Sequence, residues 1–113
     1  MIERKSKLIQ KSLQYINSHL SIKLHVKEIA KELFVAPRTL SKHFREEVGM
    51  SIGQYIDQRV QFEAEILLTD GDMTIEQISE KLGFCDRFYF THKFKEKKYK
   101  TPVQYRKESR IYQ

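Results

Sequence analysis

The stretch TIEQISEKLGFCDRFYFTHKFKEKK, residues 74–98, contains the signals that begin and end two consecutive helices. Thr74 followed by Gln77 is a capping-box pattern, which opens a helix because each side chain can satisfy a backbone N–H of the first turn. Gly83 then ends that helix, since glycine readily adopts the left-handed conformation found after many helices. Asp86 can cap a second helix that continues to the end of the stretch. Two short helices joined by a tight turn are typical of a helix-turn-helix.

The same pattern occurs earlier in the chain. Apolar positions repeat at an offset of 49 residues through the pair Leu33 and Leu82, and at an offset of 50 from the pair Leu40 and Phe90 onward. The matched positions are Val26, Ile29, Leu33, Leu40, Phe44, Ser51 and Tyr55 in the first copy and Ile75, Ile78, Leu82, Phe90, Phe94, Thr101 and Tyr105 in the second. A repeat of this length indicates one supersecondary unit used twice.

Helical periodicity also covers the rest of the chain. Residues 51–68 are predicted to form one helix between the repeats, with two apolar stripes that should pack against both of them. The stripes are Ile56, Val60, Ala64 and Leu67, and Tyr55, Phe62 and Ile66. An opening helix is predicted from Ile9, Leu13, Ile16 and Leu20, and a last one from Thr101 and Pro102. Strand patterns are absent, so the predicted fold class is all-α.

The second helix of the opening stretch is both aromatic and basic. Phe90 and Phe94 are four residues apart and share one face, and with Phe84 from the turn they are predicted to be core. The other side of that helix carries Arg87, Phe88, Thr91, His92 and Lys95. This arrangement leaves a polar face available to a groove, and the DNA major groove is wide enough to admit one helix.

The equivalent face of the first repeat carries Arg38, Ser41, Lys42 and Arg45. Arginine and lysine can donate to guanine, serine can bond either base type, and a phenylalanine such as Phe88 can press on a thymine methyl. Thr91 and His92 can form hydrogen bonds to bases, whereas Lys93, Lys97, Lys98 and Lys100 are expected to meet phosphates. Each of these side chains alone could equally be a solvated surface residue, but their occurrence in two matched helices favours a reading face.

The charge of the chain is unevenly distributed. Residues 87–110 contain nine basic and two acidic side chains, a net charge of +7, so the remaining residues sum to −1 within a total of +6. Such an asymmetry favours a polyanionic partner, nucleic acid rather than an acidic membrane surface. The alternative is a solvated, lysine-rich end of a helix.

Other classes of function lack their signals. No apolar stretch approaches the roughly 20 residues of a membrane span. The four histidines lack the spacing of a helical metal-ligand pair, and no nucleophile–base pair, phosphate-binding glycine loop or carboxylate dyad is present. We therefore expect no metal, no cofactor and no catalysis. Cys85 is the only cysteine, which fits a reducing cytoplasm, and it is interpreted as a small turn residue rather than a redox switch.

The sequence resembles the AraC/XylS family of bacterial transcription regulators. The resemblance rests on ISEKLGFCDRFYFTHKFK (78–95), TPVQYR (101–106) and IAKELFVAPRTLSKHFREEVGMSIGQYI (29–56), and it extends over about residues 8–107. It implies that residues 1–113 form one DNA-binding domain of seven helices. Two helix-turn-helix subdomains, at about 26–47 and 75–98, would be joined by a linker helix at about 51–68.

The family presents two recognition helices to successive segments of the major groove. Carried over to this chain, the base-reading positions are Arg38, Ser41 and Lys42, with Arg45 beside them, and Arg87, Phe88, Thr91 and His92. These are largely the positions that helical geometry selects.

The chain departs from the family pattern at several positions. Phe34 and Tyr99 stand where the family has glycine, so the first turn must either be strained or take another shape, and the end of the second recognition helix is open to question. Ser79 replaces an alanine, Ala36 lacks the usual capping hydroxyl, and the linker helix has Val60 where an arginine is usual.

The sequence as a whole predicts sequence-specific binding of double-stranded DNA in transcription regulation, more likely activation than repression. The expected setting is the bacterial cytoplasm, at the nucleoid. Binding as a monomer or as a dimer is compatible with two recognition helices in one chain. Two alternatives stay open: a module that binds a protein such as RNA polymerase, and a non-specific nucleic-acid binder.

Overall fold

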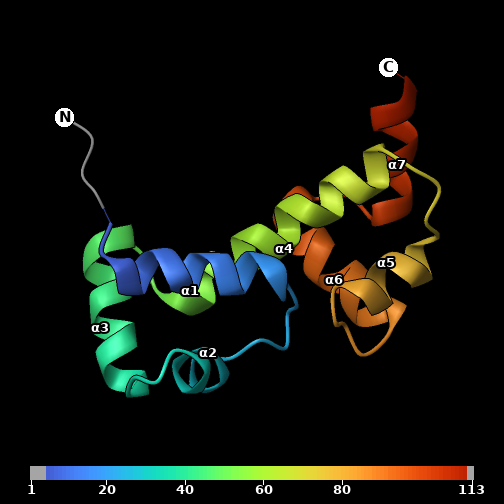
Figure 1. The fold of residues 1–113 in the computed structure, drawn as a ribbon. Helices are drawn as coiled ribbons and strands as arrows, with labels where there is room; N and C mark the ends of the chain where they lie inside the picture. The colour runs from blue at the N-terminus through green and yellow to red at the C-terminus, as the bar shows by residue number, and fades with distance from the viewer. Residues whose placement is uncertain (1–4, 112–113) are drawn as a thin grey trace. The chain divides into compact units, whose positions relative to one another are not determined.

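The computed structural model describes residues 5–111, which form seven α-helices and no strand (Figure 1). The helices are α1 (Lys7–Ser18), α2 (Val26–Glu32), α3 (Pro37–Val48), α4 (Ile52–Thr69), α5 (Ile75–Lys81), α6 (Arg87–Lys98) and α7 (Pro102–Ile111). The prediction of an all-α chain of about seven helices, with two helix-turn-helix pairs and a long helix between them, is confirmed.

The chain divides into two compact units, and the division falls within α4, between Arg59 and Val60. The first unit holds α1, α2, α3 and the first half of α4. The second holds the rest of α4, α5, α6 and α7, together with the short connector Ser21–Lys23. Each unit therefore contains one helix-turn-helix pair with its own core.

The core of the first unit is aliphatic, with one aromatic pair. Ile9, Ile16, Ile29, Leu40 and Phe44 from α1, α2 and α3 are fully buried. The ring of Phe44 also meets the ring of Tyr55 from α4 at a centroid distance of 5.7 Å. Burial of these side chains from three helices holds the first helix-turn-helix pair against α1.

The predicted opening helix ends earlier than its apolar pattern. Leu20 is its last apolar position in the predicted pattern, but α1 ends at Ser18 and Leu20 lies outside the helix, just before the connector Ser21–Lys23. His19 leaves the helical conformation, with φ −123° and ψ 34°. Its ring stacks on Tyr15 at 4.1 Å, and Nδ1 lies 3.0 Å from the Tyr15 carbonyl oxygen. The helix therefore ends at Ser18, two residues before Leu20, with His19 held against its last turn.

The start of α1 is tied to the end of α3. Ser6 caps α1, because its hydroxyl accepts the Ile9 N–H at 3.3 Å. The Ser6 N–H and hydroxyl also donate to the two carboxylate oxygens of Glu47, at 2.6 and 2.8 Å. These hydrogen bonds, the backbone one first, hold the pKa of the Glu47 carboxyl below its usual value because they stabilise the charged form.

The core of the second unit is a connected set of aromatic rings. Phe84 lies 5.0 Å from Phe90 between ring centroids, Phe90 lies 5.9 Å from Phe94, and Phe94 lies 5.3 Å from Tyr105 of α7. The three phenylalanines are at most 8% exposed. The prediction that they form core is confirmed, and tilted or edge-on contacts of this kind are the favoured aromatic geometry.

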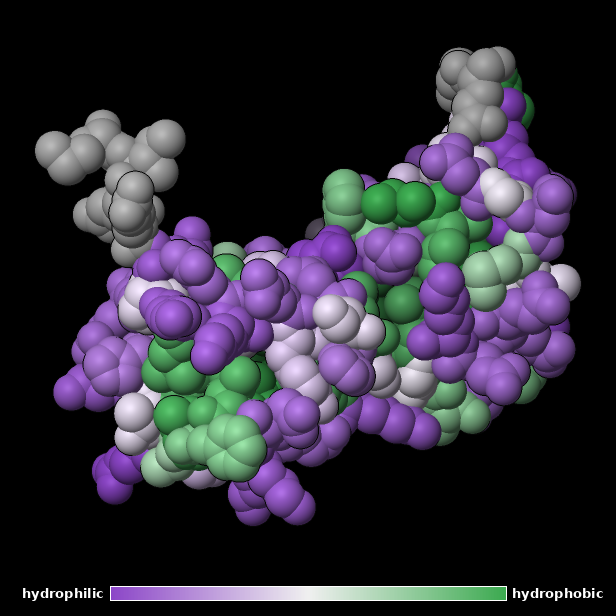
Figure 2. Space-filling view, viewed as in Figure 1, coloured by the Kyte–Doolittle hydropathy of each residue, from purple (hydrophilic) through white to green (hydrophobic). Residues whose placement is uncertain are grey.

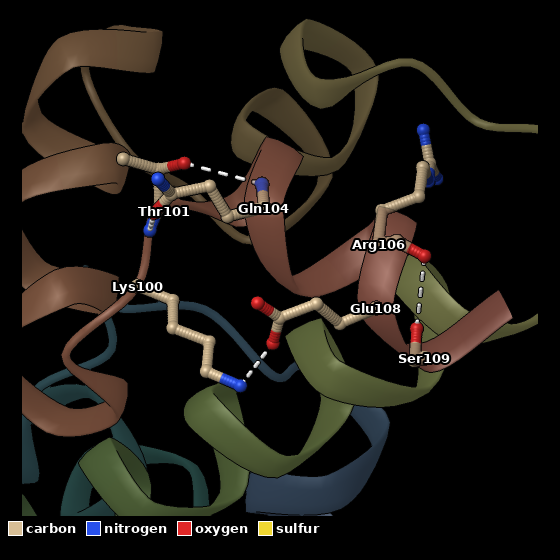
Figure 3. Close-up of polar contacts among 6 residues, drawn as sticks. All are labelled: Lys100, Thr101, Gln104, Arg106, Glu108 and Ser109. Atoms are coloured by element: carbon tan, nitrogen blue, oxygen red, sulfur yellow. Dashed lines mark hydrogen bonds and ion pairs between the residues drawn. The ribbon is translucent and has the colours of Figure 1, made fainter. Parts of the chain in front are cut away.

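The helix starts in the second unit carry the predicted caps. Thr74 and Gln77 form the full capping box of α5, and the Asp86 carboxylate accepts the Tyr89 N–H at 2.8 Å to cap α6. Thr101 and Gln104 make the same reciprocal pair at α7, drawn in Figure 3, with N···O distances of 2.9 and 3.2 Å. Each cap satisfies N–H groups that the first turn cannot pair by itself.

Only one of the two apolar stripes predicted for α4 is buried. Ile56, Val60 and Ala64 are at most 3% exposed, and the same stripe continues to Leu68 rather than Leu67. On the second stripe, Phe62 is 57% and Ile66 is 39% exposed. Figure 2 accordingly shows hydrophobic residues at the surface around the C-terminal half of α4. The expectation of two packed faces is wrong, because α4 buries a single i, i+4 row.

Candidate nucleic-acid interface

In each unit, one residue in the turn before the second helix of the helix-turn-helix and one at that helix's C-terminal end adopt the left-handed backbone conformation. In the first unit they are Phe34, with φ 59°, and Gly49, with φ 87°. In the second they are Gly83, with φ 85°, and Tyr99, with φ 59°. In the turn, the first unit has Phe34 where the second has Gly83. At the helix end, the first unit has Gly49 where the second has Tyr99.

The turn between α2 and α3 therefore keeps the shape that glycine would give it, and Phe34 is strained there. A left-handed residue with a Cβ costs roughly 1–2 kcal/mol relative to a right-handed one, and Phe34 and Tyr99 both carry that cost. The exchange is sterically possible at these two positions because both side chains project into solvent, with exposures of 95% and 87%.

The turn of the second unit is more restricted. A Cβ placed on Gly83 would lie 2.0 Å from the Ser21 hydroxyl oxygen, closer than real Cβ contacts allow. The connector also bonds to this turn directly, since the Ile22 N–H donates to the Leu82 carbonyl at 2.8 Å. At Gly49, by contrast, a Cβ would meet nothing within 4 Å. Both backbone conformation and space therefore favour glycine at position 83, whereas conformation alone favours it at Gly49.

In the first unit, α3 presents the predicted reading face to solvent. Arg38, Ser41, Lys42 and Arg45 are all exposed. Within residues 5–111 their side chains have no hydrogen-bond or ion-pair partner. Leu40 and Phe44 on the opposite side of the helix are fully buried. The helix is thus fixed by its apolar side, while four polar side chains, three of them cationic, remain available to a ligand.

In the second unit, α6 has the same two-sided arrangement. Arg87, Phe88, His92 and Lys95 are exposed and Thr91 is half-buried, opposite the buried Phe90 and Phe94. Two of the predicted reading residues touch neighbours. The Arg87 guanidinium lies 5.8 Å from the centroid of the 76% exposed Phe88 ring, and His92 Nε2 lies 3.0 Å from Glu96 Oε1.

The start of α6 is held by a contact that the sequence did not predict. The Ser79 hydroxyl, on a residue 2% exposed in α5, donates to the Asp86 carbonyl oxygen at 3.0 Å. The Asp86 side chain caps the helix at the same point. The first unit has Ala30 and Ala36 at the corresponding positions, so α3 has neither bond and begins with Pro37. The sequence showed that Ser79 stands where the family usually has alanine. It did not show that the Ser79 hydroxyl would bond to the Asp86 carbonyl.

Several cations expected to meet phosphates are paired within the protein. Lys98 lies 3.1 Å from the Glu65 carboxylate of α4, Lys93 lies 3.9 Å from Glu96, and Lys100 contacts Glu108, as Figure 3 shows. Lys97 has no such partner among the described residues. The cationic surface available to DNA is therefore smaller than the basic composition of residues 87–110 implies.

Two arginines of α7 donate hydrogen bonds to backbone carbonyls at and just after the C-terminal end of α4. Arg106 donates from Nε to the Leu68 carbonyl at 3.1 Å and from its terminal nitrogen to the Leu67 carbonyl at 3.3 Å. Arg110 donates to the Leu68 carbonyl at 3.4 Å and to that of Gly71. Burial, with a contribution from the nearby Arg110 charge, lowers the pKa of Arg106. The carbonyl groups left unpaired at the helix end are satisfied in this way.

Beside the start of α6 lies an open, mainly acidic hollow. Its lining includes Glu76, Glu80 and Asp86, together with Ser79, Phe84, Arg87, Phe88 and the exposed Cys85. Within the part of the chain that the structure covers, no three His, Cys, Asp or Glu side chains are grouped as metal ligands. No helix in that part is long and apolar enough to cross a membrane.

Known proteins share this sequence and fold. The family model described as a helix-turn-helix domain matches residues 29–108. The urease operon transcriptional activator of Escherichia coli is 39% identical over 89 residues, which cover 78% of this chain and 29% of that protein. The arabinose operon regulatory protein of Escherichia coli K12 is 30% identical over 100 residues, 87% of this chain and 34% of the relative.

The fold comparison agrees with the sequence comparison. The C-terminal domain of AraT, a response regulator from Geobacillus stearothermophilus, superimposes with a TM-score of 0.86 at 29% identity, over 94% of this chain and 88% of that one. The chain spans about a third of the length of the curated relatives it matches. The matched family model covers both helix-turn-helix pairs almost completely. The chain belongs to the AraC/XylS family of helix-turn-helix proteins.

Proposed function

We propose that this chain binds specific sequences of double-stranded DNA in transcription regulation and that α3 and α6 both read bases. The observation that carries the proposal is the matched pair of exposed polar faces, each fixed by buried apolar residues on the other side of its helix. The family membership supports it, because the relatives include operon regulators and an activator.

The roles of the side chains follow from their chemistry. Arg38 and Lys42 donate to guanine, and Ser41 bonds either base type. On α6, Arg87 donates to guanine while Phe88 contacts a thymine methyl. Because the Arg87 guanidinium already lies near the Phe88 ring, the two side chains enter the groove with their relative position partly set.

The remaining members of the two faces have supporting roles. Thr91 and His92 form hydrogen bonds to base edges, and Arg45 and Lys95, one helical turn further along, contact the edge of the groove. Lys97 binds a phosphate, because it is a cation without a protein partner among the described residues. Two recognition helices in one chain allow it to bind DNA as a monomer. Binding takes place in the bacterial cytoplasm, and its effect is to activate transcription.

Selection of bound duplexes from a random pool at about 0.15 M salt tests the proposal. The expected result is a bipartite motif whose two blocks lie about one helical turn apart, roughly 10 bp. Enrichment of a single block would contradict base reading by both helices. Equal retention of random DNA and of RNA would instead favour a non-specific nucleic-acid binder and sink specific regulation.

Two substitutions, each of which removes one positive charge, distinguish base recognition from phosphate binding. Arg87→Ala is expected to weaken the selected duplex by about 1–3 kcal/mol and to relax base choice at one position of the site. Lys97→Ala should weaken all duplexes alike and reduce the slope of log K against log salt by about one. Equal losses on selected and random DNA for both variants would contradict this assignment of roles.

A protein partner is a second candidate function, favoured by the acidic hollow beside α6. Its carboxylates at Glu76 and Glu80 suit a basic surface on RNA polymerase, the partner that activation requires. Glu80→Lys should abolish activation from a reporter promoter while leaving DNA affinity undiminished. A variant that still activates fully would rule out this surface as the polymerase contact.

A further inference from the structure

Tyr99 is held in a conformation that its own side chain disfavours, at the end of the candidate reading helix. Its φ is 59°, and its N–H caps α6 by donating to the Lys95 carbonyl at 2.8 Å. The equivalent residue of the first unit is Gly49, which adopts the same left-handed conformation without the steric cost of a Cβ. Phe34 carries the same strain in the first unit, so what distinguishes Tyr99 is its place at the C-terminal end of a candidate reading helix.

The neighbouring residues on both sides explain how the conformation is imposed. Lys98, just before Tyr99, is anchored to Glu65 at 3.1 Å. Lys100, just after it, is paired with Glu108, and the following residue caps α7 (Figure 3). Because the chain is fixed immediately before and after Tyr99, relaxing its backbone would break contacts on both sides. The ring is thus presented from a rigid turn.

Nothing in the described part of the protein engages the ring or the hydroxyl of Tyr99. The side chain is 87% exposed, and no hydrogen bond, ion pair or ring contact joins it to residues 5–111. Burial therefore offers no reason for an aromatic residue here. Its equivalent at Gly49 shows that the fold does not require a side chain at this point.

Tyr99 lies directly beyond the end of the reading face. Phe88, His92 and Lys95 are spaced i, i+4 and i+7 on one side of α6, and the Lys95 carbonyl accepts the N–H of Tyr99, the first residue after the helix. Lys95 is an exposed cation on that side without a partner among the described residues. A helix lying in the major groove has its far end over the phosphate backbone, and tyrosine hydroxyls are among the groups that bond phosphate oxygens.

We infer that Tyr99 contacts DNA, its hydroxyl donating a hydrogen bond to a backbone phosphate beside the site read by α6. The inference rests on the proposed DNA-binding function and adds one anchoring contact that the first unit, with Gly49, does not make. A phosphate contact holds the helix in register but does not choose bases. Tyr99 therefore adds affinity on every sequence.

Three variants of the full chain test this contact. Tyr99→Phe keeps the ring and the strained backbone but removes the hydroxyl. Tyr99→Gly removes the side chain and the strain together. Phe34→Gly relieves the same strain in the other unit, in the turn before α3. Affinity for the selected duplex and for a scrambled duplex is measured by fluorescence anisotropy at several salt concentrations. Thermal unfolding is followed on the same samples.

The expected results have opposite signs for stability and binding. Tyr99→Phe and Tyr99→Gly should each weaken both duplexes by about three- to tenfold, the worth of one net hydrogen bond. The salt slope should not change, because a neutral phenol releases no counterion. Tyr99→Gly and Phe34→Gly should both raise the melting temperature, Tyr99→Phe should leave it unaltered, and Phe34→Gly should bind DNA as the unchanged chain does.

Three outcomes overturn the contact, and one of them also overturns the proposed function. Unaltered binding by Tyr99→Phe would remove the hydroxyl contact while leaving DNA reading by the chain intact. A loss of affinity in Phe34→Gly equal to that in Tyr99→Gly would attribute the effect to backbone relaxation instead. If the unchanged chain shows no preference for any duplex and no DNA affinity, the proposed function fails with the inference.

Discussion

The Ser79 hydroxyl donates a 3.0 Å hydrogen bond to the carbonyl oxygen of Asp86, the residue whose side chain caps α6. One buried side chain of α5 thus fixes the point at which the candidate reading helix of the second unit begins. The first unit, with Ala30 and Ala36 at these positions, has no such bond. The two recognition helices are therefore held at their starts by different means.

Replacing Ser79 by alanine is expected to loosen the start of α6. Loss of one buried hydrogen bond should lower the free energy of unfolding by about 0.5–1.5 kcal/mol. Base discrimination should fall only in the block of the DNA site that α6 reads, because Arg87 and Phe88 lie in the first turn after Asp86. Chemical denaturation and binding to single-base variants of the selected duplex measure the two effects.

Ser12→Ala is the matched control for this substitution. Ser12 is equally buried, but among residues 5–111 its hydroxyl donates only to the Ile9 carbonyl of the same helix, at 2.8 Å. It should cost stability without altering discrimination. If Ser79→Ala changed neither stability nor discrimination, the bond would have no positioning role.

Substitution by alanine should destabilise the protein less at Gly49, which has open space around it, than at Gly83, which lies against Ser21. Gly49→Ala should cost about 1–2 kcal/mol, the penalty of a left-handed residue with a Cβ. Gly83→Ala should lower the free energy of unfolding by about 1–3 kcal/mol more than Gly49→Ala does. The added Cβ would overlap the Ser21 hydroxyl and force the connector to move. Urea unfolding of the two variants measures the difference.

A Ser21→Gly background separates the two contributions at Gly83. Removing the Ser21 side chain should recover much of the excess cost of Gly83→Ala and leave the conformational part. Equal costs for alanine at the two glycines in the original background would mean that the connector yields freely.

Acid stability should depend on the bond between Ser6 and Glu47. Because the folded-state pKa of Glu47 lies below the unfolded value of about 4.3, its stabilising effect is complete above that value and is lost as the pH falls through the folded pKa. Glu47→Gln should therefore lower the melting temperature at pH 7 and reduce the loss of stability between neutral and acid pH.

Glu32→Gln provides the comparison, because Glu32 is an exposed carboxylate without a partner among the described residues. Its melting temperature should follow that of the unchanged chain at every pH. Parallel pH curves for Glu47→Gln and the unchanged chain would show that the Ser6 contact contributes nothing.

Arg106 is expected to matter for stability more than for DNA affinity. Its side chain satisfies the Leu67 and Leu68 carbonyls at the end of α4, so Arg106→Ala should lower the free energy of unfolding by about 1–2 kcal/mol. The adjacent Lys107 is exposed, and Lys107→Ala removes the same charge without removing a bond to the protein. Urea unfolding should distinguish the two variants, while their effects on DNA affinity at low salt should be similar. A larger affinity loss for Arg106→Ala at unchanged stability would instead make Arg106 a DNA contact.

Local signals in the sequence were sufficient for much of the fold. The capping residues Thr74, Asp86 and Thr101 act on neighbours three residues away, so their effect can be read from the sequence. The exposure of the polar side of α6 was also predictable, because helical spacing alone separates it from the buried Phe90 and Phe94. Both kinds of inference depend on residues that are close along the chain.

Contacts between distant residues could not be predicted in this way. The pairing of Lys98 with Glu65, and of Arg106 with the end of α4, depends on which helices meet, so cations that seemed available to DNA proved to be engaged. For Phe34 the sequence left strain and a different turn shape as alternatives, and only the structure decides for strain, as it does at Tyr99. Residue preference favours glycine there, and only the surrounding contacts impose the left-handed backbone on an aromatic residue.

The exposed thiol of Cys85 has a practical consequence for all of these measurements. It is the only cysteine of the chain and lies two residues before Arg87, at the entrance to the α6 face. A maleimide dye will therefore attach at a single position, in the native sequence, next to the proposed DNA-reading face of α6. Its emission can follow association and dissociation in real time without any engineered label.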